Sequence, residues 1–131
     1  VLHKEIEMPK RILIVDDTAT VVMFEKMMLS SQGYAFDTAT NGEDALVLVE
    51  QRRPDLILLD IMMPKMDGIE TCRRLKSNPD TNAIPVVMVT TKGEAERVEQ
   101  AFLAGCDDYI TKPVDKLELL TKVATHLSRT E

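Results

Sequence analysis

The stretch "KRILIVDDTAT", residues 10–20, runs from two basic residues through four aliphatic ones into a pair of aspartates. A short aliphatic run between polar neighbours is typical of a buried strand. The pattern returns in "DLILLD" (55–60), "IPVVMVT" (84–90) and the weaker "DYIT" (108–111), whereas "YAFDTAT" (34–40) alternates polar and apolar positions. We therefore expect five strands, of which the one over 34–40 has a less buried side.

Segments with helical spacing follow each predicted strand. We expect helices over about 19–32, in "GEDALVLVEQRR" (42–53), "DGIETCRRLKS" (67–77), "EAERVEQAFLAG" (94–105) and "DKLELLTKVATHL" (115–127). In the last of these the apolar face is predicted to be formed by Leu117, Leu120, Ala124 and Leu127. Asp17 or Thr18 is a plausible N-cap of the first helix, and Gly33 is its predicted C-terminal stop. Strands and helices that alternate in this way predict an α/β fold with a doubly wound five-stranded parallel sheet, covered on both faces.

Composition bounds the class of protein. The chain has 131 residues, 44% of them hydrophobic and 29% charged, which fits one globular domain. Its net charge of -6 argues against an electrostatic hold on nucleic acid or anionic membrane. The chain has two cysteines, Cys72 and Cys106, too few for a disulfide framework, and its two histidines are too scattered to give a zinc-binding spacing. We expect both cysteines in the core and His126 solvated at a helix end.

The ends of the sequence and the absence of a long apolar run bear on location. No run approaches the roughly 20 apolar residues that cross a bilayer, and the first residues have no signal-peptide core. We predict a cytoplasmic protein with a domain over 10–129 and an N-terminal extension or linker over 1–9. Either Met8 lies near the natural start, or these first residues are a linker.

Charged side chains gather where the predicted strands end. Asp16 and Asp17 follow the first strand, Asp60 ends the third, Thr90 the fourth and Lys112 the fifth. Because the carboxyl ends of parallel strands share one edge of the sheet, these groups should lie close together. Each close pair of carboxylates repels by about 4 kcal/mol at an effective dielectric of about 20. The pattern therefore favours a bound divalent cation, and Mg²⁺ is the expected one. The same groups are those that phosphoryl transfer to a carboxylate requires: an acid as nucleophile, a metal ion, a lysine and a hydroxyl.

Four motifs together identify a family. "ILIVDD", "PDLILLDIMMPKMDG", "PVVMVTT" and "GCDDYITKP" occur in this order between about residue 10 and residue 127. With these four motifs the chain resembles a response-regulator receiver domain of two-component signalling, similar to the chemotaxis regulators. The resemblance implies a (βα)5 flavodoxin-like fold with strand order 2-1-3-4-5.

The resemblance also implies an acceptor and a metal site. Asp60 is similar to the aspartate that takes a phosphoryl group from a histidine kinase or a histidine phosphotransfer protein. Asp16, Asp17 and Asp60, with the backbone carbonyl of Met62, match the family's Mg²⁺ ligands.

Further residues match the family's responding groups. Thr90 resembles the hydroxyl that bonds a phosphoryl oxygen, and Lys112 the lysine that pairs with another. Pro113 is expected to follow a cis peptide bond, and Tyr109 resembles the aromatic switch. The implied output is a changed surface of helix 4, strand 5 and helix 5, which binds a downstream protein or output domain. No direct contact with nucleic acid or membrane is expected, nor any catalysis beyond the domain's own phosphorylation and dephosphorylation.

Simpler interpretations of these residues remain open. Asp16 and Asp17 could merely end a strand and cap a helix, Thr90 is an ordinary strand residue, and a half-buried Tyr109 is common. A metal-dependent phosphatase is a rival, although Ile61 and Met62 follow Asp60 where a second acid is wanted. A receiver fold without phosphorylation is another. In this family, the positions of Met62 and Lys92 influence how long the phosphate survives, and Thr91 could crowd the path of the phosphoryl group or of Tyr109.

Overall fold

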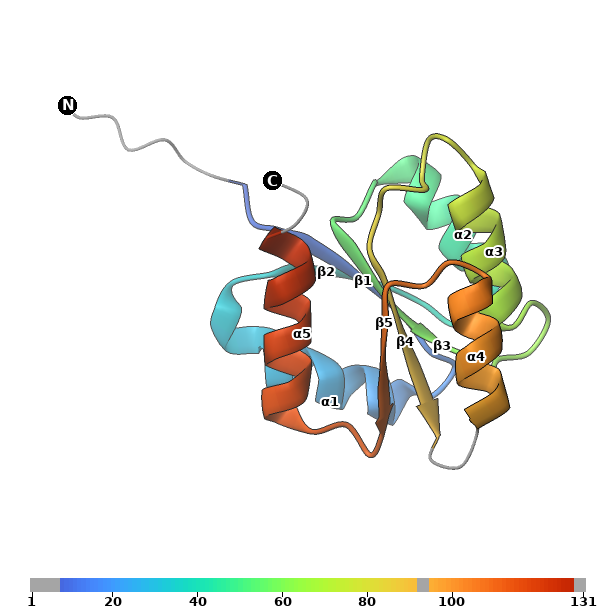
Figure 1. Cartoon of the computed structure of the whole chain (residues 1–131). Coiled ribbons are helices and arrows are strands. Elements are labelled where there is room, and N and C mark those ends of the chain that lie inside the picture. Colours follow the sequence, from blue (N-terminus) through green and yellow to red (C-terminus); the bar gives the residue numbers. More distant parts are fainter. Residues whose placement is uncertain (1–7, 92–94, 129–131) are drawn as a thin grey trace.

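The computed structural model describes residues 8–91 and 95–128 and has a central parallel sheet with helices on both faces (Figure 1). The strands are β1 (Arg11–Val15), β2 (Ala35–Ala39), β3 (Leu56–Asp60), β4 (Val86–Thr91) and β5 (Asp108–Lys112). The helices are α1 (Ala19–Leu29), the 3-10 turn η1 (Ser30–Gln32), α2 (Gly42–Gln51), α3 (Gly68–Ser77), α4 (Ala95–Leu103) and α5 (Lys116–Ser128).

The five strands lie in the order β2-β1-β3-β4-β5, and every pairing is parallel. This confirms the predicted flavodoxin-like α/β fold. Val15 is in register with Leu59, and Thr91 is in register with Lys112. The carboxyl ends of β1, β3, β4 and β5 therefore form one continuous edge, with the reversal of strand order between β1 and β3.

Two apolar layers hold the sheet between its helices. α1 and α5 pack together on one face, while α2, α3 and α4 cover the other (Figure 1). Alternate residues of β1 enter different layers, because Ile12 and Ile14 belong to the first and Leu13 and Val15 to the second. All four are at most 1% exposed, as expected for a strand buried on both faces.

Local signals set most of the helix ends. Asn41 caps α2, with its side-chain oxygen accepting the backbone N–H of Asp44 at 2.9 Å. Gly33 has φ +75°, a left-handed conformation that favours glycine, and it ends the turn after α1 as predicted. Thr18 is the N-cap of α1 but makes no side-chain cap hydrogen bond. The predicted Glu94 lies outside the described residues.

The buried face of α5 differs from the prediction. Leu127 is buried and Leu120 packs against the core, as predicted, but Leu117 is 73% exposed and Ala124 is exposed. Leu119 and Val123, which were not predicted, are fully buried instead. His126 is also buried, at 6% exposure, and its Nε2 lies 2.9 Å from Asp108 Oδ2. The expectation of a solvated histidine was therefore wrong, because an acid on β5 supplies a partner that the helix alone does not reveal.

The two cysteines and the lengths of the helices also agree with what the sequence predicts. Cys72 and Cys106 are buried free thiols, as predicted, and burial raises their pKa to about 11 and about 12. Among the described residues, none of the helices has both the length and the apolar character needed to span a bilayer.

Candidate functional site

An acidic cluster lies at the carboxyl edge of the sheet. Asp16 and Asp17 directly follow β1, and Asp60 is the last residue of β3. One carboxylate oxygen from each of the three lies within 4.8 Å of the others. The structure thus brings Asp60 to the adjacent pair Asp16 and Asp17, more than forty positions earlier in sequence, as the parallel topology predicts.

Lys112 supplies the positive charge of this cluster. Its Nζ donates to Asp16 Oδ2 at 3.2 Å and to Asp60 Oδ1 at 3.4 Å. The ammonium therefore bridges carboxylates from β1 and β3 while belonging to β5. The Lys112–Pro113 peptide bond is cis, as the resemblance to the receiver family implies.

Burial and repulsion shape the charge of these groups. Desolvation, followed by the charge of Asp16, raises the pKa of Asp60 to about 6, although Lys112 acts in the opposite direction. Burial by itself would lower the pKa of Lys112, but the carboxylates of Asp60 and Asp16 outweigh it and the pKa is raised. One ammonium therefore compensates the three acids only in part, and the cluster favours a further cation.

Backbone groups fix the acids in place. Asp16 Oδ1 accepts the backbone N–H of Thr18 at 2.8 Å, and the Asp16 N–H donates to the Ala39 carbonyl at 3.1 Å. Asp60 Oδ1 accepts a longer bond of 3.4 Å from the N–H of Met62. Asp16 therefore has little freedom, whereas Asp60 is held less tightly.

The loop after β3 returns close to the phosphoacceptor candidate through Gly68. The Gly68 N–H donates to the Ile61 carbonyl at 2.8 Å. A Cβ at this glycine would lie 2.1 Å from the carbonyl oxygen of Asp60, a distance that no side chain can occupy. The glycine in "KMDG" is thus needed for the close approach of α3 to the end of β3, a role that the sequence alone did not reveal.

The donor set fits a hard divalent cation. Three carboxylates offer oxygen ligands within reach of one ion, and Mg²⁺ prefers such ligands together with retained waters. Asp16 and Asp60 are 2% and 5% exposed, while Asp17 is exposed and leaves a side open to water. Met62 is 49% exposed, and its backbone carbonyl remains a predicted ligand.

The other predicted residues lie along the neighbouring strands. Thr90 is buried at the end of β4, in register with Thr111 of β5. Tyr109 is half-buried near the start of β5, and its ring makes an edge contact with Phe102 at 6.0 Å between centroids. Lys122 Nζ lies 5.2 Å from the centre of the same ring. Lys92 lies outside the described residues.

A third buried acid, next to the cluster, was missed. Glu25 of α1 is 2% exposed, and no described residue hydrogen-bonds its Oε2. The signal was present in "VVMFEKMML", where Glu25 shares the inner face of the helix with Leu29, four residues on.

Comparison with known proteins agrees with this geometry. The profile of the response regulator receiver domain matches residues 12–124, so the chain belongs to this family of two-component signalling domains. It is 43% identical over 119 residues to the transcriptional regulatory protein ResD of Bacillus subtilis, covering 91% of this chain and 48% of ResD. It is 41% identical over 121 residues to the DNA-binding dual master transcriptional regulator RpaA of Synechocystis, covering 92% of this chain and 50% of RpaA.

Solved structures show the same fold. The signal receiver domain of a signal transduction histidine kinase from Syntrophus aciditrophicus has a TM-score of 0.87 and 38% identity, over 93% of this chain and 92% of that one. The chain spans about half the length of the curated relatives named above.

Proposed function

We propose that Asp60 is the phosphoacceptor of a two-component switch and receives its phosphoryl group from a histidine kinase or a histidine phosphotransfer protein. The observation that carries this proposal is the convergence of Asp16, Asp17 and Asp60 with Lys112 at the end of the sheet. A receiver domain implies a kinase partner, and the family assignment supports that part directly.

The transfer joins a carboxylate oxygen of Asp60 to phosphorus as the bond from phosphorus to the donor's imidazole nitrogen breaks. The leaving nitrogen keeps the electron pair of that bond. The product is an acyl phosphate on Asp60. Lys112 lies 3.4 Å from Asp60 Oδ1 and is placed to balance the charge of the phosphoryl oxygens. Thr90, at the end of the neighbouring strand, is proposed to donate its hydroxyl to another of these oxygens.

Asp16, Asp17 and Asp60 are the side chains that would hold Mg²⁺, with the carbonyl of Met62 as a further ligand. Bound Mg²⁺ supplies positive charge to the oxygens of the transferred group. The backbone N–H of Thr18 anchors the Asp16 carboxylate. Asp16 is therefore proposed to hold and orient the metal ion and not to react itself.

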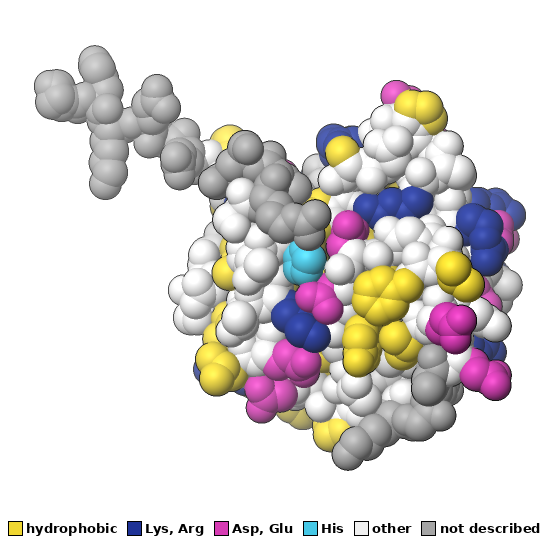
Figure 2. All heavy atoms as spheres, in the orientation of Figure 1, with side chains coloured by type: hydrophobic (Ala, Val, Ile, Leu, Met, Phe, Trp, Pro, Cys, Tyr) yellow, Lys and Arg dark blue, Asp and Glu magenta, His cyan; other side chains and the backbone are white. Residues whose placement is uncertain are grey.

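The signal is proposed to reach the surface of α4, β5 and α5. Phosphorylation adds about 1.5 to 2 negative charges and three acceptor oxygens at Asp60. Movement of Thr90 toward them would free space for Tyr109, whose ring now packs against Phe102 and Lys122. On this face, apolar side chains gather between acidic and basic ones (Figure 2), which suits a protein partner.

Partners and location follow from the same proposal. A downstream protein or an output domain binds the α4, β5 and α5 face. RpaA is a DNA-binding regulator by name, and this chain covers half of its length. Our expectation of no direct nucleic-acid contact therefore concerns only the residues of this receiver domain. We propose that the receiver domain spans 10–129, that residues 1–9 are an extension or linker, and that the domain works in the cytoplasm.

Phosphorylation by a small donor tests the acceptor. The protein is incubated with acetyl phosphate and Mg²⁺, and its intact mass is measured. We expect the mass of one phosphoryl group on the wild type and none on Asp60→Asn or in the presence of a chelator. Equal labelling of Asp60→Asn would refute the assignment, and steady turnover of an added phosphate ester would favour a phosphatase instead.

A spectroscopic comparison tests the switch separately. Amide NMR spectra recorded with and without beryllofluoride and Mg²⁺ should change at Thr90, Tyr109 and along α4 and α5. Changes confined to the acidic cluster would leave Asp60 as an acceptor but would refute this route to the output surface.

A further inference from the structure

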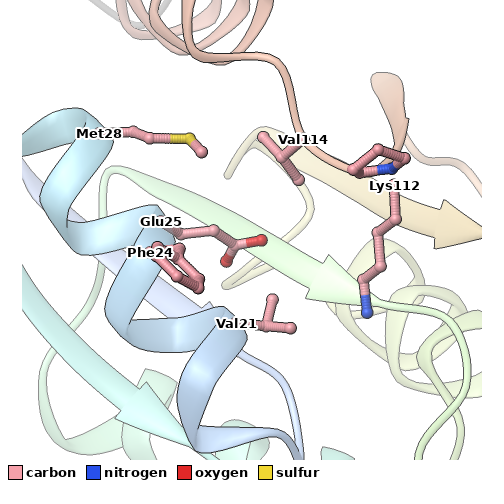
Figure 3. Close-up of a pocket in the computed structure, with 7 residues that line it drawn as sticks. Val21, Phe24, Glu25, Met28, Lys112 and Val114 are labelled. Carbon is pink, nitrogen blue, oxygen red and sulfur yellow. The ribbon is translucent and has the colours of Figure 1, made fainter.

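A pocket of about 360 Å³ lies between α1 and the chain that leaves β5 (Figure 3). Its walls are mainly apolar. They are formed by Val21, Phe24, Glu25 and Met28 of α1 with Lys112, Pro113 and Val114. The pocket is thus a neighbour of the acidic cluster, with Lys112 belonging to both.

Glu25 is the unusual member of this lining. Figure 3 shows its carboxylate directed from α1 into the space between Val21 and Val114. The side chain is 2% exposed, and its Oε2 lacks a hydrogen-bond partner within the described part of the chain. Burial, followed by the charge of Asp16, raises the pKa of this carboxyl to about 7. A buried acid without a partner destabilises a fold, so its presence at the wall of a pocket points to a ligand.

The charges around the pocket indicate the sign of that ligand. The charges of Asp16 and Asp60 raise the pKa of Glu25, and Lys112 is the cation that acts against them among the described residues. The Lys112 ammonium donates to Asp16 and Asp60, and within the described residues Glu25 Oε2 accepts no hydrogen bond. An incoming positive group is therefore favoured over a neutral or a negative one.

The walls indicate the body of the ligand. Phe24 is 50% exposed at the rim, and Met28 and Val114 contribute further apolar surface. Water is a poor occupant, since an ordered water needs about two to four polar partners and this pocket offers few beyond Glu25. The volume is at the lower end of the range of small-molecule sites, about 300 to 1,000 Å³.

We propose that this pocket binds a small organic amine, with its ammonium donating to Glu25 Oε2 and its hydrocarbon body packed against Phe24, Met28 and Val114. The proposal does not depend on phosphorylation of Asp60. An occupant would nevertheless lie beside Lys112 and hence next to the acidic cluster.

Titration with 2-phenylethylamine, followed by amide NMR on the whole chain near pH 8 without Mg²⁺, tests the proposal. We expect saturable shifts in α1 and around residues 112–114. Glu25→Gln keeps the shape of the side chain but removes its charge, and should weaken binding at least about tenfold, as expected for the loss of a charge-assisted hydrogen bond. The uncharged analogue 2-phenylethanol should bind the wild type more weakly by a similar factor.

Control variants separate this site from general effects. Glu43 is exposed on α2, so Glu43→Gln removes the same charge far from the pocket and should leave the affinity unchanged. If Glu25→Gln does not fold, Phe24→Ala at a half-exposed position should weaken binding instead. The proposal is overturned if the wild type shows no saturation, if amine and alcohol bind equally, or if Glu25→Gln and Glu43→Gln behave alike.

Discussion

Replacing Glu25 by glutamine should stabilise the protein at neutral and alkaline pH. Glutamine is nearly the same size but never ionises, so the substitution isolates the effect of the buried charge. The pKa of Glu25 is raised from its ordinary value of 4.5 to about 7, chiefly by burial. In the unfolded chain the side chain would titrate near the ordinary value.

The magnitude and the sign follow from proton linkage. The folded protein keeps a proton on Glu25 that the unfolded chain has lost between pH 4.5 and about 7, so stability falls as the pH rises through this window. Each pKa unit corresponds to about 1.4 kcal/mol, which gives a full penalty of about 3 to 4 kcal/mol well above pH 7. The penalty is nearly absent below the ordinary pKa.

Urea unfolding without Mg²⁺ measures this effect. The free energy of unfolding is determined for the wild type and for Glu25→Gln at about pH 5 and about pH 8, and the difference between the two proteins should grow by roughly 2 kcal/mol in favour of glutamine. Glu43→Gln, at an exposed position, should change stability by no more than about 0.5 kcal/mol at either pH. A difference that does not depend on pH would refute the reasoning, since it would mean that Glu25 is not held in a setting that opposes its charge.

Three predictions concern the acidic cluster. Lys112→Met removes the cation that bonds Asp16 and Asp60, so calorimetry should show severalfold tighter Mg²⁺ binding, and weaker binding would contradict this. Because the pKa of Asp60 is raised to about 6, Mg²⁺ must displace a proton from this residue below that pH. The Mg²⁺ affinity measured by calorimetry should therefore fall by up to about tenfold for each pH unit below 6, and an affinity that does not change with pH would exclude Asp60 as a ligand. Gly68→Ala places a Cβ 2.1 Å from the Asp60 carbonyl and should lower the free energy of unfolding by at least about 2 kcal/mol, against little change for the exposed Ser77→Ala; equal stabilities would refute the close approach.

Much of the fold could be predicted because its signals are local. Each buried strand is a short aliphatic run, and parallel topology then places Asp16, Asp17 and Asp60 at one edge without any knowledge of contacts. Gly33 and the Asn41 cap are likewise recognisable from turn and cap chemistry.

The errors have a common physical origin in contacts between distant segments. His126 is buried because Asp108, eighteen residues earlier on β5, accepts its Nε2–H with a carboxylate oxygen. The need for glycine at 68 arises from the Asp60 carbonyl, and only the assembled loop reveals it. Glu25 is different, since its position on the inner face of α1 could be read from helical periodicity, but the absence of a partner could not.

The most direct test of the central claim is to locate the phosphoryl group on the chain. After reaction with acetyl phosphate and Mg²⁺, borohydride reduction converts a phosphorylated aspartate to homoserine. The peptide over 53–65 contains two aspartates, Asp55 and Asp60, and its fragment masses show which of them was converted. We predict conversion at Asp60 alone, and none when Mg²⁺ is chelated. Conversion at Asp55, at Asp16 or Asp17, or at no residue would contradict the account.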